Sequence, residues 1–522
     1  MGTANSIQAK EISENESDDT TLQKKNISES LDGLSSLKAP EFQIVTQEAY
    51  SHPIIEHKNT WKSLVWDTWG HPDKRHVKII RKLDLTLLLF ATVSTFIKYI
   101  DKTNLTSAYV SGMLDYFEKK GYELTIQLNW ANNGYNIASI VFGYPFGYLM
   151  ARYSTKWLVI SIEVAWIIVT MCFSSIKSPT QMIVLRTLLG AFECGHYPAL
   201  SFLLGSYYTK EELARRNVLL QSSTALGSMF ASYIQSGAYT HLDGKLGREG
   251  WSWTFIIDGV ISLGVLVPQI IFFPDILSRA TPGLVFSEDE IEYLQSRKPE
   301  SRNEKYNFSL NDIKEVFTTW EVWAFWFFGV SQDIVSLSMV TFIFWIEGWN
   351  TIKEGSYSVP QINNFNSILY AVQYLVAIVT GWSSDTFLRG KRWPPIVLAG
   401  LISFVVTIIL ASTPVYPHHR GFRFFLYLNT SWALGTAGLY WAYAQEYFEY
   451  NFRLKAIVTG GINIYSFTAN CIVNPIWFRT DKQPYVQTGH YISAFFAFWY
   501  AAVAALLGWN EYRKSKAISQ LS

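Results

Sequence analysis

The chain has 522 residues, of which 49 % are hydrophobic and 16 % are charged, whereas an average soluble domain contains about 25 % charged residues. A transmembrane helix needs about 20 mainly apolar residues, so this composition indicates a membrane protein with many spans. The net charge of +1 gives no indication of a nucleic-acid partner. The 3 cysteines all lie in apolar stretches, which excludes a disulfide framework and a cysteine-based zinc site.

Residues 1–70 differ in composition from the rest of the chain. They are rich in Ser, Glu, Asp, Lys and Asn and contain no long apolar run. We therefore expect a disordered cytosolic tail rather than a cleavable signal. Within this tail, residues 60–69 (TWKSLVWDTW) suit either a short amphipathic helix at the membrane surface or an apolar stretch of linker.

Apolar windows recur along the remaining chain and predict transmembrane helices. They lie near 83–100, 129–150, 157–175, 181–205, 217–239, 254–274, 322–346, 362–381, 394–412, 422–444, 456–477 and 490–509. A polar stretch divides the windows into six and six. The predicted parts are a tail at 1–70, an N-terminal six-helix bundle at 71–274, a central loop at 275–321, a C-terminal six-helix bundle at 322–509 and a tail at 510–522.

The distribution of basic residues predicts the orientation of these helices. If the N-terminus is cytosolic, the cytosolic loops carry roughly twice as many Lys and Arg as the opposite loops, as the positive-inside rule requires. The sequence thus predicts an all-α membrane protein of twelve transmembrane helices with both termini cytosolic. Two joined six-helix halves are typical of secondary transporters, whose site lies between the halves. A channel or a membrane-embedded enzyme is the alternative at this stage.

Two predicted cytosolic loops match each other and suggest gates. The loop between the second and third windows begins at Gly147 and contains Arg152, and the loop between the eighth and ninth begins at Gly381 and contains Asp385 and Arg389. A glycine lets two helices approach closely. An acidic residue at a helix end and basic residues in the following turn can form ion pairs that break when the two halves rock.

Ionisable residues inside a membrane are costly and usually functional. Lys98, Asp101 and Lys102 stand at the end of the first window with spacing i, i+3 and i+4, which places them on one helix face. Lys98 can also extend its amine to the membrane surface. We expect Asp101 to carry a proton and Lys102 to bind an anion.

The fourth window contains the sequence RTLLGAFECGHYPA. Arg186 and Glu193 are seven residues apart and therefore share a face, with His196 one turn further on. Arg186 can hold a carboxylate bidentately and stays charged. When an anionic substrate takes the guanidinium, an ionised Glu193 loses its partner and binds a proton, because an unpaired carboxylate is costly at low dielectric. This arrangement would couple anion binding to proton binding, whereas the alternative is a static Arg186–Glu193 ion pair.

Polar and aromatic residues of the second half complete the list of candidates. We expect His196, Asn463 and Asn470 to contact substrate, because imidazole and amide groups hydrogen-bond polar groups. Lys98, Asp333, Trp345 and Tyr440 are further possible site residues, although each also suits helix packing. Asp258 suits helix packing as well. We expect no cofactor, no metal site and no catalytic residue.

Several motifs together resemble one family. RTLLGAFECGHYPA resembles the fourth-span motif of the anion:cation symporters within the major facilitator superfamily, and Asp101-Lys102 resembles that family's Asp-Arg pair. The gating loops resemble the signature loops of the superfamily. The stretches AYVSGM, HLDG and FIID are similar to the fungal allantoate permease branch, which includes pantothenate, biotin and nicotinate transporters.

The resemblance implies the major facilitator fold and a division of roles. It gives proton transfer to Asp101 and Glu193, and anion recognition to Lys102 and Arg186. Lys102 departs from the family's Arg, so it would bind a carboxylate as a point charge.

We therefore expect a monomeric, multi-pass transporter of the fungal plasma membrane, surrounded by lipid, that imports a small carboxylate together with protons. Pantothenate is the first substrate prediction, and biotin, nicotinate, allantoate or another organic anion are alternatives. Two other functions remain open. A transporter-like nutrient sensor fits the long tail, and a drug/proton antiporter is disfavoured by the fixed charge of Arg186.

Overall fold

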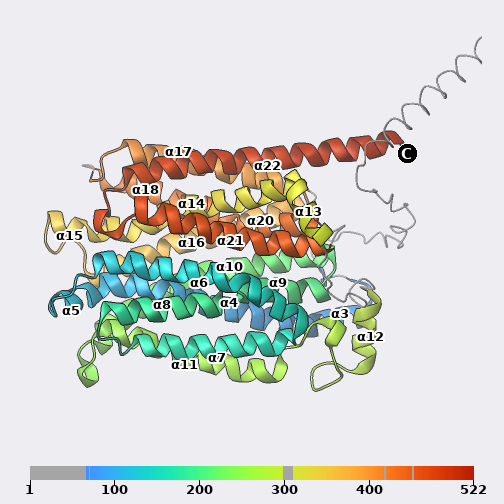
Figure 1. Ribbon diagram of the computed structural model, residues 1–522, viewed down its shortest axis with the longest axis horizontal. Helices are drawn as coiled ribbons and strands as arrows, with labels where there is room; N and C mark the ends of the chain where they lie inside the picture. The colour runs from blue at the N-terminus through green and yellow to red at the C-terminus, as the bar shows by residue number, and fades with distance from the viewer. Residues whose placement is uncertain are drawn as a thin grey trace, which may run out of the picture. The chain divides into compact units, whose positions relative to one another are not determined.

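The computed structural model describes residues 66–69, 71–297, 310–388, 390–416, 419–448 and 452–521. Helices form the regular secondary structure of this part of the chain, and they lie side by side in Figure 1. The predicted tail at 1–70 and the predicted surface helix at 60–69 fall outside the described residues, apart from a short turn at 66–69.

The helices of the first half follow the predicted windows in order. They are α3 (Lys74–Leu83), α4 (Leu89–Ala108), α5 (Leu114–Glu118), α6 (Thr125–Arg152), α7 (Thr155–Phe173), α8 (Pro179–Glu193), α9 (His196–Tyr207), α10 (Lys210–Leu242) and α11 (Gly250–Phe272), with single π-turns joining α3, α4 and α5. The fourth window is broken into α8 and α9. Proline has no N–H to donate four residues back, so Pro198 leaves the Cys194 carbonyl without its helical partner at the break.

The second half follows in the same way after the central loop. It comprises α12 (Glu288–Arg297), α13 (Leu310–Thr318), α14 (Trp320–Glu347), α15 (Trp349–Ile352), α16 (Val359–Thr386), α17 (Trp393–Ser412), α18 (Arg420–Asn429), α19 (Trp432–Gly435), α20 (Ala437–Tyr447), α21 (Phe452–Trp477) and α22 (Gln487–Leu521). Helices α12 and α13 belong to the predicted central loop. We call α3–α11 the N-terminal bundle and α14–α22 the C-terminal bundle.

Among the described residues, 7 helices are long and apolar enough to cross a membrane. The remaining long helices, such as α6 and α10, have more polar sequences, and α8 and α9 are each short.

The first long helix extends beyond the first predicted window. The window at 83–100 ends before Asp101, but α4 continues to Ala108. Asp101, which follows the predicted window, is buried within the bundle.

The two bundles meet through a few long helices. Helix α10 packs against both α4 and α16, and α6 packs against both α8 and α21. We call the two ends of the helices the α5 end and the α12 end (Figure 1). The bundles touch at both ends. Asn363 Nδ2 donates to Ser111 Oγ over 2.9 Å at the α5 end, and Arg215 Nε lies 3.5 Å from Asp385 Oδ2 at the α12 end.

Candidate functional site

Helix α4 presents a column of polar side chains to the interior of the N-terminal bundle. Lys98, Asp101 and Asn104 are all buried. Asn104 Nδ2 donates to Asp258 Oδ2 on α11 over 2.7 Å, so Asp258 joins two helices as the sequence predicted for a packing residue. Neither carboxylate oxygen of Asp101 has a hydrogen-bond partner among the described residues. A buried carboxylate without donors is costly when ionised, which suits a group that binds a proton.

Glu193 ends helix α8 and is fully buried. The hydroxyl of Tyr135 donates to Glu193 Oε2 over 3.0 Å. Lys98 Nζ donates to the Glu193 backbone carbonyl over 2.9 Å and lies 4.0 Å from Glu193 Oε2. Lys98 is therefore the cation that pairs with this carboxylate.

Arg186 takes a different place from the one predicted. The sequence suggested an ion pair with Glu193, but Arg186 Nη2 donates to the Lys102 carbonyl over 3.2 Å and its guanidinium carbon lies 4.9 Å from the centre of the Tyr135 ring. Arg186 Nε has no hydrogen-bond partner among the described residues. The guanidinium is 5 % exposed and has no carboxylate partner within ion-pair distance in the described part of the chain. The predicted pairing was wrong because spacing along one helix does not reveal Lys98, which approaches from α4.

The C-terminal bundle brings Asp333 toward this cluster. Asn470 Nδ2 on α21 donates to Asp333 Oδ2 on α14. The ammonium of Lys102 is exposed, and it is the cation that acts electrostatically on Asp333 from across the bundles. The structure thus joins Asn470, which we expected to contact substrate, to Asp333, which was a further possible site residue.

Three other candidates from the second half lie in different surroundings. Trp345 is buried and its Nε1 donates to the Val415 carbonyl over 2.7 Å. Tyr440 is also buried, and its hydroxyl donates to the Phe325 carbonyl over 3.0 Å. Both polar groups are thus satisfied by backbone, which favours packing. Asn463 is half-buried on α21.

His196 stands at the start of α9 and is fully buried. Its Nε2 lies 2.7 Å from Ser94 Oγ and 3.3 Å from Glu163 Oε1. Ser94 Oγ also contacts Glu163 Oε1. Sequence reasoning missed Glu163, although a single acidic residue within the apolar window at 157–175 was a readable signal. The contacts of His196 are with these two side chains inside the bundle.

The predicted gate between α16 and α17 contains a close helix contact and a cluster of charges. A Cβ on Gly381 would lie 2.6 Å from Val218 Cγ1 on α10, so glycine is needed where the bundles meet. Asp385 pairs with Arg392 of its own bundle as well as with Arg215 of the other. Arg392 Nη2 also lies 2.9 Å from Glu446 Oε1. Arg389 lies outside the described residues.

The matching loop between α6 and α7 is built differently. A Cβ on Gly147 would have no neighbour within 4 Å. Arg152 Nη1 donates to the Tyr148 hydroxyl over 2.9 Å. The two loops therefore resemble each other in sequence, but the close approach between bundles occurs at Gly381.

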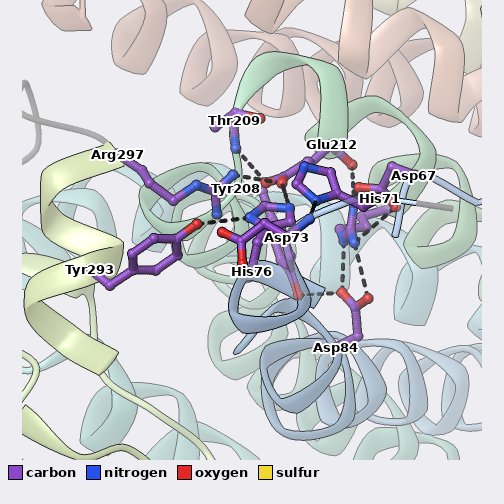
Figure 2. Close-up of polar contacts among 11 residues, drawn as sticks. Asp67, His71, Asp73, His76, Asp84, Tyr208, Thr209, Glu212, Tyr293 and Arg297 are labelled. Atoms are coloured by element: carbon purple, nitrogen blue, oxygen red, sulfur yellow. Dashed lines mark hydrogen bonds and ion pairs between the residues drawn. The ribbon is translucent and has the colours of Figure 1, made fainter. Parts of the chain in front are cut away.

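A further network of charges ties the α12 end of the N-terminal bundle together (Figure 2). Arg216 is fully buried and pairs with Asp84 over 2.7 Å and with Asp67 over 2.8 Å. Glu212 pairs with Arg297 of α12 over 2.6 Å. Sequence reasoning missed this network. The spacing from Thr209 to Glu212, which forms a capping box at the start of α10, was a readable signal for part of it.

The candidate residues thus fall into three chemical groups. Arg186 and Lys102 are cations, Asp101 and Glu193 are buried carboxylic acids, and Asp333 with Asn470 provides polar groups from the C-terminal bundle. Groups of His, Cys, Asp and Glu that could hold a metal ion are absent from the described residues. Buried charges within one of two helical bundles suit the translocation of a polar solute.

Comparison with known proteins identifies the class and then the family. The fold matches the solved structure of the proton:xylose symporter XylE with a TM-score of 0.60, covering 82 % of this chain and 95 % of that one at 13 % identity. The chain thus shares the fold of that structure. A family model described as Major Facilitator Superfamily matches residues 91–474. The chain belongs to the major facilitator superfamily.

Two fungal relatives cover much of the chain. It is 31 % identical over 360 residues to the MFS transporter PfmaC of Pestalotiopsis fici, covering 68 % of this chain and 65 % of the relative. It is 26 % identical over 435 residues to the pantothenate transporter FEN2 of Saccharomyces cerevisiae, covering 80 % of this chain and 81 % of the relative.

Proposed function

We propose that this chain is a proton-coupled symporter that imports a small carboxylate across the plasma membrane, with pantothenate as its first substrate. Twelve transmembrane helices, in two six-helix bundles with cytosolic termini, would move by alternating access. One observation carries the proposal. Arg186 is a buried guanidinium without a carboxylate partner in the described part of the chain, and the cost of such a charge is offset when an anion binds.

The chemistry of the surrounding groups supports this assignment. A substrate carboxylate can accept two hydrogen bonds from the guanidinium fork of Arg186. Asp333 and Asn470 can bind hydroxyl or amide groups at the other end of the molecule. Pantothenate has a carboxylate at one end and hydroxyl and amide groups toward the other, and a relative that matches most of this chain is named for it. Biotin, nicotinate and allantoate are the alternative carboxylates.

Coupling to protons follows from the electrostatics of the cluster. Lys98, and after it Arg186, favours the ionised form of Glu193 while the site holds no anion. An arriving carboxylate neutralises Arg186 and weakens that support, so Glu193 binds a proton more readily. Asp101 can also take up a proton, because its buried carboxyl stands beside that of Asp258 on α11. The loaded site is then closer to neutral, which lowers the cost of moving it across the membrane.

The test is uptake of labelled pantothenate, biotin and nicotinate by cells that lack their own carriers. We expect the full chain to accumulate one of these compounds at acidic pH, and a protonophore to abolish the accumulation. A fluorescently tagged chain should lie at the plasma membrane.

A variant separates coupling from binding. Glu193→Gln should lose accumulation but retain exchange of internal for external substrate, since exchange needs no net proton movement. Glu292→Gln makes the same chemical change on the exposed face of α12 and should behave like the parent chain. Normal accumulation by Glu193→Gln would contradict the proposed coupling.

A further inference from the structure

A second group of ionisable side chains lies deeper in the N-terminal bundle. The group consists of Glu163 on α7, His196 on α9 and Ser94 on α4. His196 Nε2 lies 3.3 Å from Glu163 Oε1 and 2.7 Å from Ser94 Oγ. The side chain of Glu163 is 4 % exposed and that of His196 is fully buried. The edge of the Trp166 ring system packs against the imidazole, with ring centres 4.8 Å apart. The three polar side chains therefore depend on one another for hydrogen bonds.

A small cavity of about 10 Å³ adjoins this group. Its lining includes Ser94, Glu163, Trp166, Ser262 and Gln269. Two buried donors in this lining, Trp166 Nε1 and Gln269 Nε2, have no hydrogen-bond partner among the described residues. A cavity of this size accommodates about one water molecule, and such a water needs two to four polar partners. The cavity supplies both the room and the partners beside the Glu163 carboxylate.

Among the described residues, the ion-pair partner of Glu163 is the imidazole of His196, whereas Lys98 pairs with Glu193. An ionised Glu163 beside a neutral His196 would therefore leave a buried negative charge without a cation at ion-pair distance. Such a charge is costly, so a proton held between Glu163 and His196 stabilises this group.

We propose that Glu163, His196 and Ser94, with a water molecule in the adjoining cavity, form a second proton-binding site in the N-terminal bundle. One proton is held there by a new O–H bond on Glu163 or a new N–H bond on His196, and the same bond breaks when the proton leaves. This proposal rests on the proton coupling proposed above and extends it toward the α12 end of the bundle.

The charged and titratable groups around this site come from several helices. Helix α9 contributes His196 itself, Lys98 of α4 acts electrostatically on that imidazole, and α11 contributes the uncharged Ser262 and Gln269.

Infrared difference spectroscopy of the purified full-length protein, recorded between alkaline and acidic buffer without substrate, tests the site directly. We expect Glu163→Gln to remove one protonated-carboxyl band that the parent protein shows. An unchanged carboxyl spectrum in Glu163→Gln would overturn the proposal.

Ser94→Ala keeps the test decisive if Glu163→Gln folds poorly. Loss of the hydroxyl removes a hydrogen-bond partner of Glu163, so the Glu163 band should shift while the number of titrating carboxyl groups stays the same. Ser161→Ala, on the exposed side of α7, is the matched control and should leave the spectrum unchanged. A Ser94→Ala spectrum identical to this control would contradict the second site.

Transport assays give a second readout in liposomes with labelled pantothenate. Glu163→Gln should retain exchange but slow proton-driven accumulation by about tenfold or more, as expected for loss of a proton-transfer group. Accumulation at the parent rate would overturn the proposal. If the parent itself does not transport pantothenate, the symport proposal fails for that substrate, while the infrared titration still decides whether Glu163 binds a proton.

Discussion

The two bundles share a fold but differ in where they bury charge. The N-terminal bundle encloses Lys98, Asp101, Glu163, Arg186, Glu193 and Asp258, all buried. In the C-terminal bundle, Asp333 is half-buried and hydrogen-bonded to an amide, and the core is rich in aromatic rings such as Phe325, Tyr440 and Tyr500. Buried acidic residues thus gather in the N-terminal bundle, while the buried charges of the C-terminal bundle are the cations Arg392 and Arg423 among the described residues. This difference supports the proposal that proton exchange takes place in the first bundle.

The α12 ends of the bundles differ as well. Arg216 and Glu212 anchor the N-terminal bundle to the segment before α3 and to α12. The C-terminal bundle uses Arg392 in the turn before α17. Burial disfavours its charge, but the carboxylates of Glu446 and Asp385 outweigh this effect and raise the pKa of Arg392 above its ordinary value. Arg392 therefore stays charged throughout the physiological range.

The largest effect should follow from loss of the central counter-ion. Lys98→Met leaves the buried Glu193 without its cation, and removal of one partner of a buried pair costs about 3–5 kcal/mol. We expect a matching loss in the free energy of unfolding of the purified protein, measured at neutral pH. Lys102→Met on the same helix is the control, because Lys102 is exposed.

A double variant tests whether the loss arises from this pair. Lys98→Met combined with Glu193→Gln should recover most of the stability, since both charges are then removed together. If the two losses simply add, Lys98 does not balance Glu193, and the contrast between the bundles must be explained in another way.

The next effect concerns the close contact between the bundles. Gly381→Ala places a methyl group against Val218, and such overpacking costs about 1–3 kcal/mol. We expect slower uptake, because the conformation in which α16 touches α10 becomes less populated. Gly147→Ala is the matched change in the other loop and should have little effect. Equal uptake by the two variants would show that the two loops act alike.

The sequence predicted the helices well and the site only in part. Hydropathy placed a helix in each window because the burial of apolar residues is a local property of the sequence. Helical spacing also placed Arg186 and Glu193 on one face. The partners of these residues come from other helices, as Lys98 and Tyr135 show, and no spacing within α8 can reveal them. Glu163 was missed because its role depends on His196 from a different helix.

A smaller effect is expected in the C-terminal bundle. Asp333→Asn keeps the shape of the side chain and removes its charge. If the second bundle offers neutral polar contacts, the change should cost about 1 kcal/mol of substrate binding, or roughly a fivefold higher KM, the value of one hydrogen bond. Proton-driven accumulation should persist. Measured uptake kinetics that show a complete loss of accumulation would place part of the coupling in the C-terminal bundle.

The smallest effect concerns the surface of the N-terminal bundle, where Lys82 Nζ lies 2.6 Å from Glu290 Oε2 of α12. Burial alone raises the pKa of Glu290, but the ammonium of Lys82 and the Ser287 N–H outweigh it and hold the pKa below its ordinary value of 4.5. The folded form thus binds this proton less readily than the unfolded chain. The pair therefore stabilises the fold above about pH 4.5, and its contribution is lost as the pH falls through the lowered pKa.

Glu290→Gln should remove this contribution, which we expect to be about 0.5 kcal/mol because pairs open to solvent are screened. Thermal unfolding at neutral pH should show a slightly less stable variant, and the difference from the parent should vanish in acid. Glu292→Gln, two residues further along α12 at an exposed position, should match the parent at both pH values. A loss as large as that of Lys98→Met would mean that α12 holds the bundle as strongly as the buried charges do, and the contrast between interior and surface would fail.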